Sequence, residues 1–258
     1  MILQKTTSLG YIPKKIVSLV PSQTELLHYL GLTEQTAGIT KFCIHPSAWF
    51  KTKTCVGGTK TINKKIIDQL QPDLIIANKE ENLKEQIELL ASDFPVWLTD
   101  VSSLDESLSM ISDIGKLTGK EEKAAKLVIQ IKAAFKQITI PKQTVRSAYL
   151  VWRKPYMTIG GDTFINDMLL SCGFKNVFED KKRYPEVNIT DLQNANCGVV
   201  FLSSEPYPFQ QKHIDELAIH LPGCKIILTD GEMFSWYGSR LLLSPQYFEK
   251  LIKQILVS

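Results

Sequence analysis

The stretch KIVSLVPSQTELLHYLG (residues 15–31) contains the strand-then-helix pattern that decides the fold. Lys15 to Val20 is short and β-branched, which is typical of a buried strand. The run SQTE (residues 22–25) has the S-x-x-E form of a capping box, so Ser22 and Glu25 are predicted to cap the helix behind it. Gly31 supplies a helix stop. The stretch predicts a strand that leads directly into a helix.

The same alternation continues to about residue 101. The strands are almost uninterrupted runs of apolar residues, as in LIIAN (residues 74–78), which is typical of a parallel sheet covered on both faces. The predicted strands span residues 15–20, 36–40, 74–78 and 95–99, the predicted helices span 63–70 and 82–91 besides the first, and 41–60 is predicted to be a loop. We assign residues 1–101 to an N-terminal lobe.

No strand pattern occurs between residues 103 and 138. Apolar residues recur there at spacings of three and four, for example Leu108, Ile111 and Ile114. This predicts one helix of about 35 residues, roughly 50 Å long, with Gly119 as its weak point. Such a helix is too long to return to the next strand of one sheet, so residues 102–139 are predicted to be a connecting backbone helix.

After Pro141 strands and helices alternate again, which indicates a C-terminal lobe over residues 140–258. The predicted elements are strands at 146–152, around 177, at 199–203 and at 225–229, and helices at 163–172, 190–195, 213–220 and 238–256, the last with a break permitted at Pro245. The predicted fold class is α/β, with two Rossmann-like lobes that contain parallel sheets and are joined by one long backbone helix.

Composition excludes several functions. The 258 residues carry a net charge of +3 with scattered Lys and Arg, so no nucleic-acid partner is expected. No apolar run approaches the roughly 20 residues of a membrane span, so the protein is not expected to be membrane-embedded. The first residues lack the order of a signal peptide, which predicts a cytoplasmic protein if the chain is full-length, with a periplasmic one as the alternative.

The five cysteines are odd in number and none is spaced as C-x-x-C. Reduced, mostly buried thiols are therefore expected rather than disulfides. Only Cys43 and His45 lie close enough in sequence to suggest metal ligands, and a lone histidine before Pro46 is more often structural. We predict no metal site.

Four motifs in order along the chain resemble one family. They are KIVSLVPSQTELL (residues 15–27), CVGGTK (55–60), LQPDLIIA (70–77) and YMTIGGDTFINDMLLSCG (156–173). The sequence is similar to the class III substrate-binding proteins of ATP-binding-cassette importers, the helical-backbone type that binds cobalamin, siderophores or haem. The similarity extends from about residue 14 to the C-terminus. It implies two α/β lobes bridged by a rigid helix, with the ligand in a cleft that closes only slightly.

The resemblance also implies partners. A small-molecule ligand is expected, a bulky metal chelate such as cobalamin, a ferric siderophore or haem, with no intrinsic cofactor. Family members dock on an importer permease through one glutamate on each lobe, and Lys65 and Thr190 occupy those positions here, with Glu186 and Asp191 near the second. A permease therefore remains a candidate partner, although this chain lacks the docking acids. Cargo handling in the cytoplasm is the alternative. A monomer is expected.

Ligand contacts are expected where strands end, because open α/β sheets bind ligands at the carboxyl ends of their strands. Large rings can cover the plane of a chelate, and arginine forks can bind its carboxylate, catecholate or phosphate groups. At least one ring of the segment around Trp236 is predicted to be exposed. The predicted ligand-binding residues are Lys41, Phe42, Thr59, Lys60, Lys79, Trp152, Arg153, Tyr156, Met157, Tyr184, Trp236 and Arg240.

These residues also have structural interpretations: the rings could be core or rim aromatics, and the lysines plain surface residues. The neighbouring Gly57-Gly58 could simply form a turn with positive φ. The sequence contains no G-x-S-x-G, phosphate-binding loop or G-x-G-x-x-G, and it gives no catalytic residue. We predict reversible binding of a metal chelate by a protein that is not an enzyme. The alternatives are an enzyme acting on such a cofactor and a cytoplasmic carrier or sensor.

Overall fold

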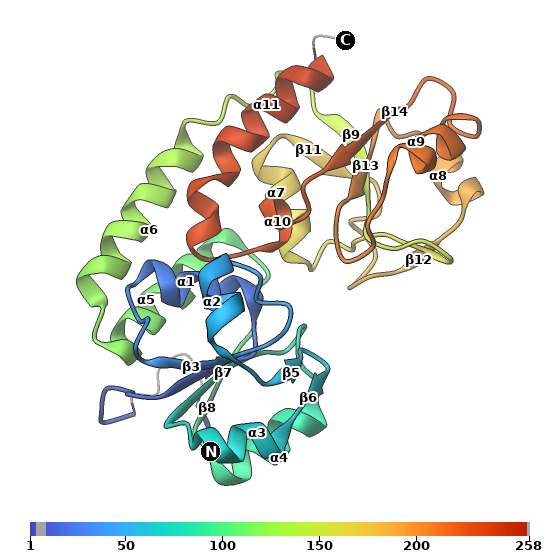
Figure 1. Ribbon diagram of the computed structural model, residues 1–258. Coiled ribbons are helices and arrows are strands. Elements are labelled where there is room, and N and C mark those ends of the chain that lie inside the picture. The colour runs from blue at the N-terminus through green and yellow to red at the C-terminus, as the bar shows by residue number, and fades with distance from the viewer. Residues whose placement is uncertain (4–8, 257–258) are drawn as a thin grey trace. The chain divides into compact units, whose positions relative to one another are not determined.

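The structure is a computed structural model that describes residues 1–3 and 9–256 (Figure 1). The chain divides into two compact units, which are described separately. Unit one comprises residues 1–101, 105–131 and 237–240, and unit two comprises 102–104, 132–236 and 241–258. None of the helices in the described ranges combines the length and the apolar character that a membrane crossing requires.

Unit one is built on a six-stranded sheet in the order β1-β8-β7-β2-β3-β4, in which every pair of neighbours is parallel. The strands are β1 (Ile2–Leu3), β2 (Ile16–Ser18), β3 (Thr36–Ile39), β4 (Thr54–Cys55), β7 (Leu74–Asn78) and β8 (Val96–Thr99). The parallel sheet predicted for this part of the chain is confirmed. The edge strands β1 and β4 were not predicted, since two residues are too few to show a pattern.

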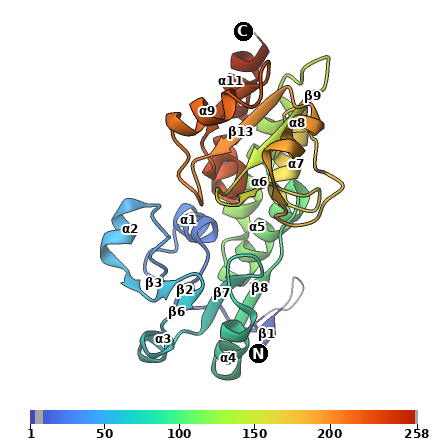
Figure 2. The ribbon, with the colours of Figure 1, turned by 90° about the vertical axis from the view of Figure 1, so that its right-hand side faces the viewer.

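Helices cover both faces of this sheet. They are α1 (Pro21–Tyr29), α2 (Ser47–Thr52), α3 (Lys64–Leu70), α4 (Lys84–Asp93) and α5 (Leu104–Thr118). Figures 1 and 2 show α3 and α4 on one side of β2, β3, β7 and β8, and α1 and α5 on the other. Ile67 of α3 and Ile87 of α4 pack against Val17 and Ile75 of the sheet, which buries an apolar core on that side.

Two local predictions in unit one are wrong. The segment 41–60 is not a plain loop, because it contains α2, β4 and the strand β5 (Gly57–Gly58), which pairs with β6 (Thr61–Ile62) in an antiparallel hairpin. The capping box is absent, because Pro21 starts α1 one residue earlier and no side chain caps it. Gly31 does end the helix region with a positive φ of 82°.

The single long helix predicted over residues 103–138 is also wrong. The structure has two helices, α5 and α6 (Glu121–Lys136), separated at Gly119, whose φ is +65°. The two helices pack closely, because a Cβ placed on Gly115 of α5 would lie 2.5 Å from Cβ of Ala124 in α6. The chain passes from unit one to unit two within α6, after Ile131.

Unit two contains a four-stranded parallel sheet in the order β11-β9-β13-β14. Its strands are β9 (Val145–Leu150), β11 (Phe174–Asn176), β13 (Val199–Ser203) and β14 (Lys225–Thr229). The strands β10 (Tyr156–Met157) and β12 (Glu186–Val187) form a separate, short antiparallel pair in the same unit. The predicted α/β class with a second parallel sheet is confirmed.

The helices of unit two enclose an aromatic core. They are α7 (Phe164–Ser171), α8 (Ile189–Ala195), α9 (Gln211–Ala218), α10 (Glu232–Ser235) and α11 (Ser244–Leu256), preceded by the 3₁₀ turn η1 (Ser239–Leu242). The rings of Tyr149, Phe201 and Phe234 are fully buried, with centroids 5.2–6.2 Å apart. The last predicted helix, over residues 238–256, is thus two elements, η1 and α11, and Pro245 stands in the first turn of α11 rather than at a kink.

Candidate functional site

The carboxyl ends of the parallel strands in unit two meet at one edge of its sheet. Trp152 and Arg153 follow β9 there, while Glu205 and Tyr207 follow β13. Because ligands of open α/β sheets bind at this edge, the side chains that gather on it form the first candidate binding surface.

Aromatic rings dominate this edge. Trp152, which is 40% exposed, packs edge-on against Tyr207 with ring centroids 5.7 Å apart. Tyr207 contacts Phe209 at 4.8 Å, and both rings contact the buried His213. Burial, and then the charge of Arg153, lowers the pKa of His213, which favours its neutral form. We call Trp152, Tyr207, Phe209 and His213 the ring cluster.

Arg153 is held beside the ring cluster by an acidic partner. Its guanidinium lies 2.5 Å from Oε2 of Glu216 in α9, and the Tyr156 hydroxyl donates to the other carboxylate oxygen at 3.3 Å. Although burial acts to raise the pKa of Glu216, the bond to Arg153 outweighs it and the pKa lies below its ordinary value. Trp152, Arg153 and Tyr156 were all predicted as ligand residues, and the structure brings them together.

A half-buried carboxylate, that of Glu205, stands at the same edge. Glu205 accepts hydrogen bonds from the Ser235 hydroxyl at 2.7 Å and from the Trp236 indole at 2.9 Å. Burial, and then the negative charge of Glu232, raises the pKa of Glu205. The prediction that a ring of the segment around Trp236 is exposed is wrong, because Phe234, Trp236 and Tyr237 are all buried.

In unit one the carboxyl edge carries Lys41 and Phe42, directly after β3. The Lys41 ammonium lies 5.2 Å from the centroid of the Phe42 ring, a cation–π distance. Phe42 is half exposed and lies against Gly58, where an added Cβ would come within 3.2 Å of the ring. Gly57, with a φ of +103°, permits the tight hairpin. The structure therefore brings Lys41 and Phe42 to the β5–β6 hairpin, whose turn is Thr59 and Lys60.

Buried amides fix the remaining loops of this edge. Gln23 donates to Oγ1 of Thr99 at 2.7 Å, and Asn78 donates to the same oxygen at 3.1 Å. Asn82 donates to the carbonyl of Thr59 at 3.0 Å, which ties the Thr59 loop to α4. These hydrogen bonds tie the loops of this edge to one another.

The other predicted ligand residues have varied surroundings. Lys79 is exposed and pairs with Asp100 at 2.8 Å, and Lys60 is exposed while Thr59 is buried. Met157 and Tyr184 are half-buried residues in or next to the β10–β12 pair.

Arg240 is buried and forms two bonds to Glu25, at 2.8 and 3.0 Å. Glu25 therefore binds Arg240 instead of capping α1. None of these placements tests ligand contact, so the twelve residues remain predictions.

The residues that sequence reasoning missed are Glu205, Tyr207, His213 and Glu216. The first two follow the predicted strand 199–203, so the rule that selected residues after strands would have found them. His213 and Glu216 carry no such mark, because only the packing of α9 brings them to the edge. Within residues 1–3 and 9–256, no group of three or more His, Cys, Asp or Glu side chains is placed to hold a metal ion.

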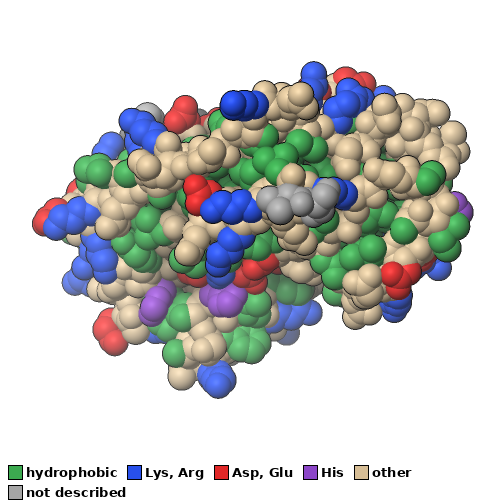
Figure 3. All heavy atoms as spheres, turned by 90° about the horizontal axis from the view of Figure 1, so that it is seen from above, with side chains coloured by type: hydrophobic (Ala, Val, Ile, Leu, Met, Phe, Trp, Pro, Cys, Tyr) green, Lys and Arg blue, Asp and Glu red, His purple; other side chains and the backbone are tan. Residues whose placement is uncertain are grey.

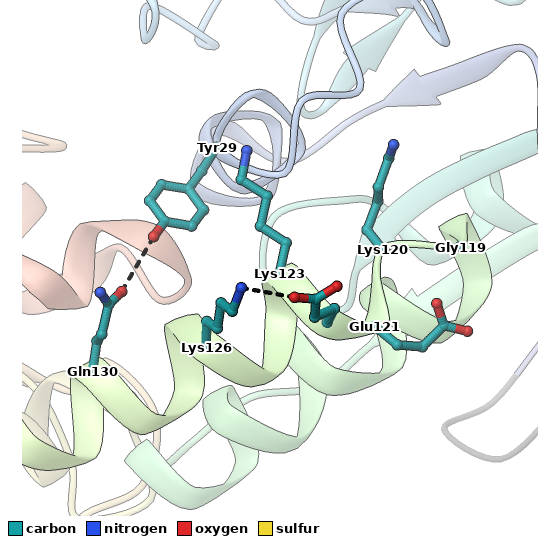
Figure 4. Close-up of a pocket in the computed structure, with 8 residues that line it drawn as sticks. Tyr29, Gly119, Lys120, Glu121, Lys123, Lys126 and Gln130 are labelled. Carbon is teal, nitrogen blue, oxygen red and sulfur yellow. Dashed lines mark hydrogen bonds and ion pairs between the residues drawn. The ribbon is translucent and has the colours of Figure 1, made fainter.

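Two surface grooves lie away from these edges. One, of about 590 Å³, is lined by Tyr29, the turn at Gly119 and the first turns of α6 (Figure 4). Three lysines line it, and Lys126 is paired with Glu122 at 2.7 Å. The other, of about 280 Å³, lies in unit two beside Cys197 and Cys224. Elsewhere the charges are mixed in sign, as the face in Figure 3 shows.

Comparison with known proteins identifies the family. The model of the family described as "Periplasmic binding protein" matches residues 16–222, and the chain belongs to this family. A substrate-binding lipoprotein of an ABC transporter from Bacillus subtilis, YvrC, is 32% identical over 191 residues, which cover 69% of this chain and 59% of that protein. This chain therefore matches about three fifths of the length of that relative.

Two further proteins are similar over most of the chain. The vitamin B12-binding protein of Yersinia pestis is 24% identical over 241 residues, which cover 90% of this chain and 84% of that protein. The crystal structure of the periplasmic vitamin B12 binding protein BtuF of Vibrio cholerae matches with a TM-score of 0.80 and 21% identity, covering 95% of this chain and 99% of that one. This last similarity shows the fold.

The predicted cytoplasmic location is wrong. The family is one of periplasmic binding proteins, and the Bacillus subtilis relative is a lipoprotein. The prediction rested on the first residues of the sequence alone. Family membership, shared over 207 residues (16–222), outweighs that signal.

Proposed function

We propose that this protein is the substrate-binding component of an ATP-binding-cassette uptake system and reversibly binds a bulky metal chelate. Its membership in the periplasmic binding protein family over residues 16–222 is the observation that carries the proposal. The Bacillus subtilis relative is named for an ABC transporter, which supports the uptake role. The Yersinia relative is named for vitamin B12, so we rank cobalamin first and place haem and ferric siderophores after it.

The ring cluster supports a flat, partly apolar ligand. Trp152 is 40% exposed although its ring packs on Tyr207, so part of its indole remains accessible to a ligand. An aromatic face can cover the plane of a corrin or porphyrin. Arg153 beside it offers planar donors for a peripheral carboxylate or phosphate, in exchange for part of its bonding to Glu216. Lys41 and Phe42 offer the same pairing of charge and ring in unit one.

Binding is tested by titrating the protein with cyanocobalamin, haemin and a ferric catecholate siderophore while tryptophan fluorescence is recorded. We expect saturable one-to-one quenching by one of the three ligands. Failure of all three to bind would contradict the proposal. Because a good ligand stabilises the folded state by mass action, the melting temperature should rise in the same samples.

The contribution of the ring cluster is tested with Trp152→Ala. We expect the Kd to rise about tenfold or more, as for the loss of a central aromatic contact. Leu170→Ala is the matched control, since Leu170 is 47% exposed in the same unit but stands on the last turn of α7. An unchanged Kd in Trp152→Ala would remove the cluster from the proposed site.

An importer permease is the proposed protein partner. Lys65 on α3 and Thr190 on α8 are exposed, as docking residues must be, although neither is acidic. Glu186 is exposed near Thr190, whereas Asp191 is engaged in the capping box of α8 with Asn188. Glu186 is therefore the better substitute of the two acids. The names of the relatives describe binding, which supports the expectation that the protein is not an enzyme.

A further inference from the structure

Two cysteines stand side by side at the amino ends of neighbouring strands in unit two. Val199 of β13 is the register partner of Lys225 of β14, and the Lys225 amide donates to the Gly198 carbonyl at 3.1 Å. Cys224 directly precedes Lys225, and Cys197 precedes Gly198. If strand spacing of about 4.8 Å and a rise of about 3.3 Å per residue are extended to the residues just before β13 and β14, the two Cα atoms are expected roughly 6 Å apart. That separation lies within the range of a disulfide.

Both thiols are also accessible. Cys197 and Cys224 are half-buried and together line the groove of about 280 Å³, next to His220. They approach the same side of the sheet, because both pack against the cluster that contains Val200 and Leu202. A small oxidant can therefore reach both sulfur atoms from one opening.

We propose that Cys197 and Cys224 are the partners of a reversible disulfide that forms outside the cytoplasm. The proposal rests on family membership, since periplasmic binding proteins work where disulfides persist, and it does not depend on the ligand. The oxidant is a small-molecule or protein disulfide. One thiolate attacks it and releases a first thiol, and the second thiolate then attacks the mixed disulfide and releases another. Two S–H bonds are lost, one S–S bond forms, and the oxidant takes up two electrons and two protons.

The rate of this reaction should depend on pH. Burial raises the pKa of Cys197 to about 12, with a further contribution from the neighbouring Cys224, and burial raises the pKa of Cys224 to about 11. In the folded protein few thiolates exist at neutral pH, so oxidation should accelerate by nearly tenfold per pH unit between pH 7 and 9. In a chain that is still folding, exposed thiols have ordinary pKa values and the bond closes faster.

The test is a thiol count on the full chain. Reduced protein is equilibrated with oxidised glutathione, alkylated, digested and analysed by mass spectrometry. We expect free thiols to fall from five to three, with a linked peptide pair that contains Cys197 and Cys224. Melting temperature should rise by several degrees on oxidation, because the bond closes a long loop.

Matched variants separate this pair from the other cysteines. Cys55→Ser removes the exposed cysteine and should still lose two thiols, whereas Cys197→Ser and Cys224→Ser should form no intramolecular bond. If either serine variant fails to fold, the peptide map of the unaltered chain decides the matter alone. Cys197 and Cys224 that both remain alkylatable, or a bond between other cysteines, would overturn the proposal.

Discussion

Arg240 shows how a single buried charge can join distant parts of the chain. It lies 215 residues beyond Glu25, yet both of its bonds to that carboxylate are 3.0 Å or shorter. The Arg240 side chain is 8% exposed and that of Glu25 is 21% exposed, so water screens the pair weakly. Such a pair adds little net stability over an apolar pair, but losing one partner leaves a buried charge unmatched.

We therefore expect Arg240→Met to lower the free energy of unfolding by about 3 kcal/mol, the usual cost of breaking a buried ion pair. Glu25→Gln should cost a similar amount for the same reason. The double variant should cost clearly less than the sum of the two, because neither charge is then left alone. Urea denaturation of all four proteins measures these values. Additive losses would mean that the pair is not coupled.

Among the helices, residues 104–136 form two packed helices, α5 and α6, and not the single continuous helix that was predicted. Their apolar spacing is continuous, so the sequence predicts one helix in which Gly119 is only a weak point. The break needs two glycines with different roles. Gly119 adopts a positive φ that ends α5, while Gly115 lets α6 approach closely. Periodicity detects apolar faces and not the closeness of helix packing.

Gly115→Ala tests this packing. Its new methyl group would lie 2.5 Å from Cβ of Ala124, so we expect a loss of about 1–3 kcal/mol from overpacking. Ala124→Gly in the same chain removes the opposing methyl group and should restore part of that loss, although glycine alone costs about 1 kcal/mol in a helix. Thermal unfolding measures the four proteins. A stabilised Gly115→Ala variant would show that the helices can separate without cost.

The sequence predicted the strands best. LIIAN and VVFLS are β7 and β13 residue for residue, because continuous burial leaves an uninterrupted apolar run. It predicted the candidate site less well. Residues after strands were found by rule, as with Trp152 and Arg153, whereas His213 and Glu216 depend on how α9 packs. The Ser22–Glu25 capping box failed because α1 already begins at Pro21, which places Ser22 inside the helix, and because Glu25 binds Arg240, which is remote in sequence.

For the molecule as a whole, membership in the periplasmic binding protein family supports the proposed function, and the carboxyl edge of each sheet carries candidate ligand residues. Charge is placed beside rings on each edge, as Arg153 with Trp152 and Lys41 with Phe42. Both arginines predicted to bind ligand already have carboxylate partners, Glu216 and Glu25. The Arg153 side chain is 17% exposed and that of Arg240 is 8% exposed, so we expect Arg153 to exchange its partner for a ligand group more readily.

We propose that the protein binds a metal chelate reversibly and leaves it unchanged. Recovery of the ligand tests this directly: the protein is loaded with cobalamin, haemin or a ferric siderophore, freed of excess ligand and unfolded, and the released chelate is quantified by absorbance and mass. We expect one intact chelate per chain for one of these ligands. Recovery of a chemically altered chelate, or of none from any of the three, would contradict it.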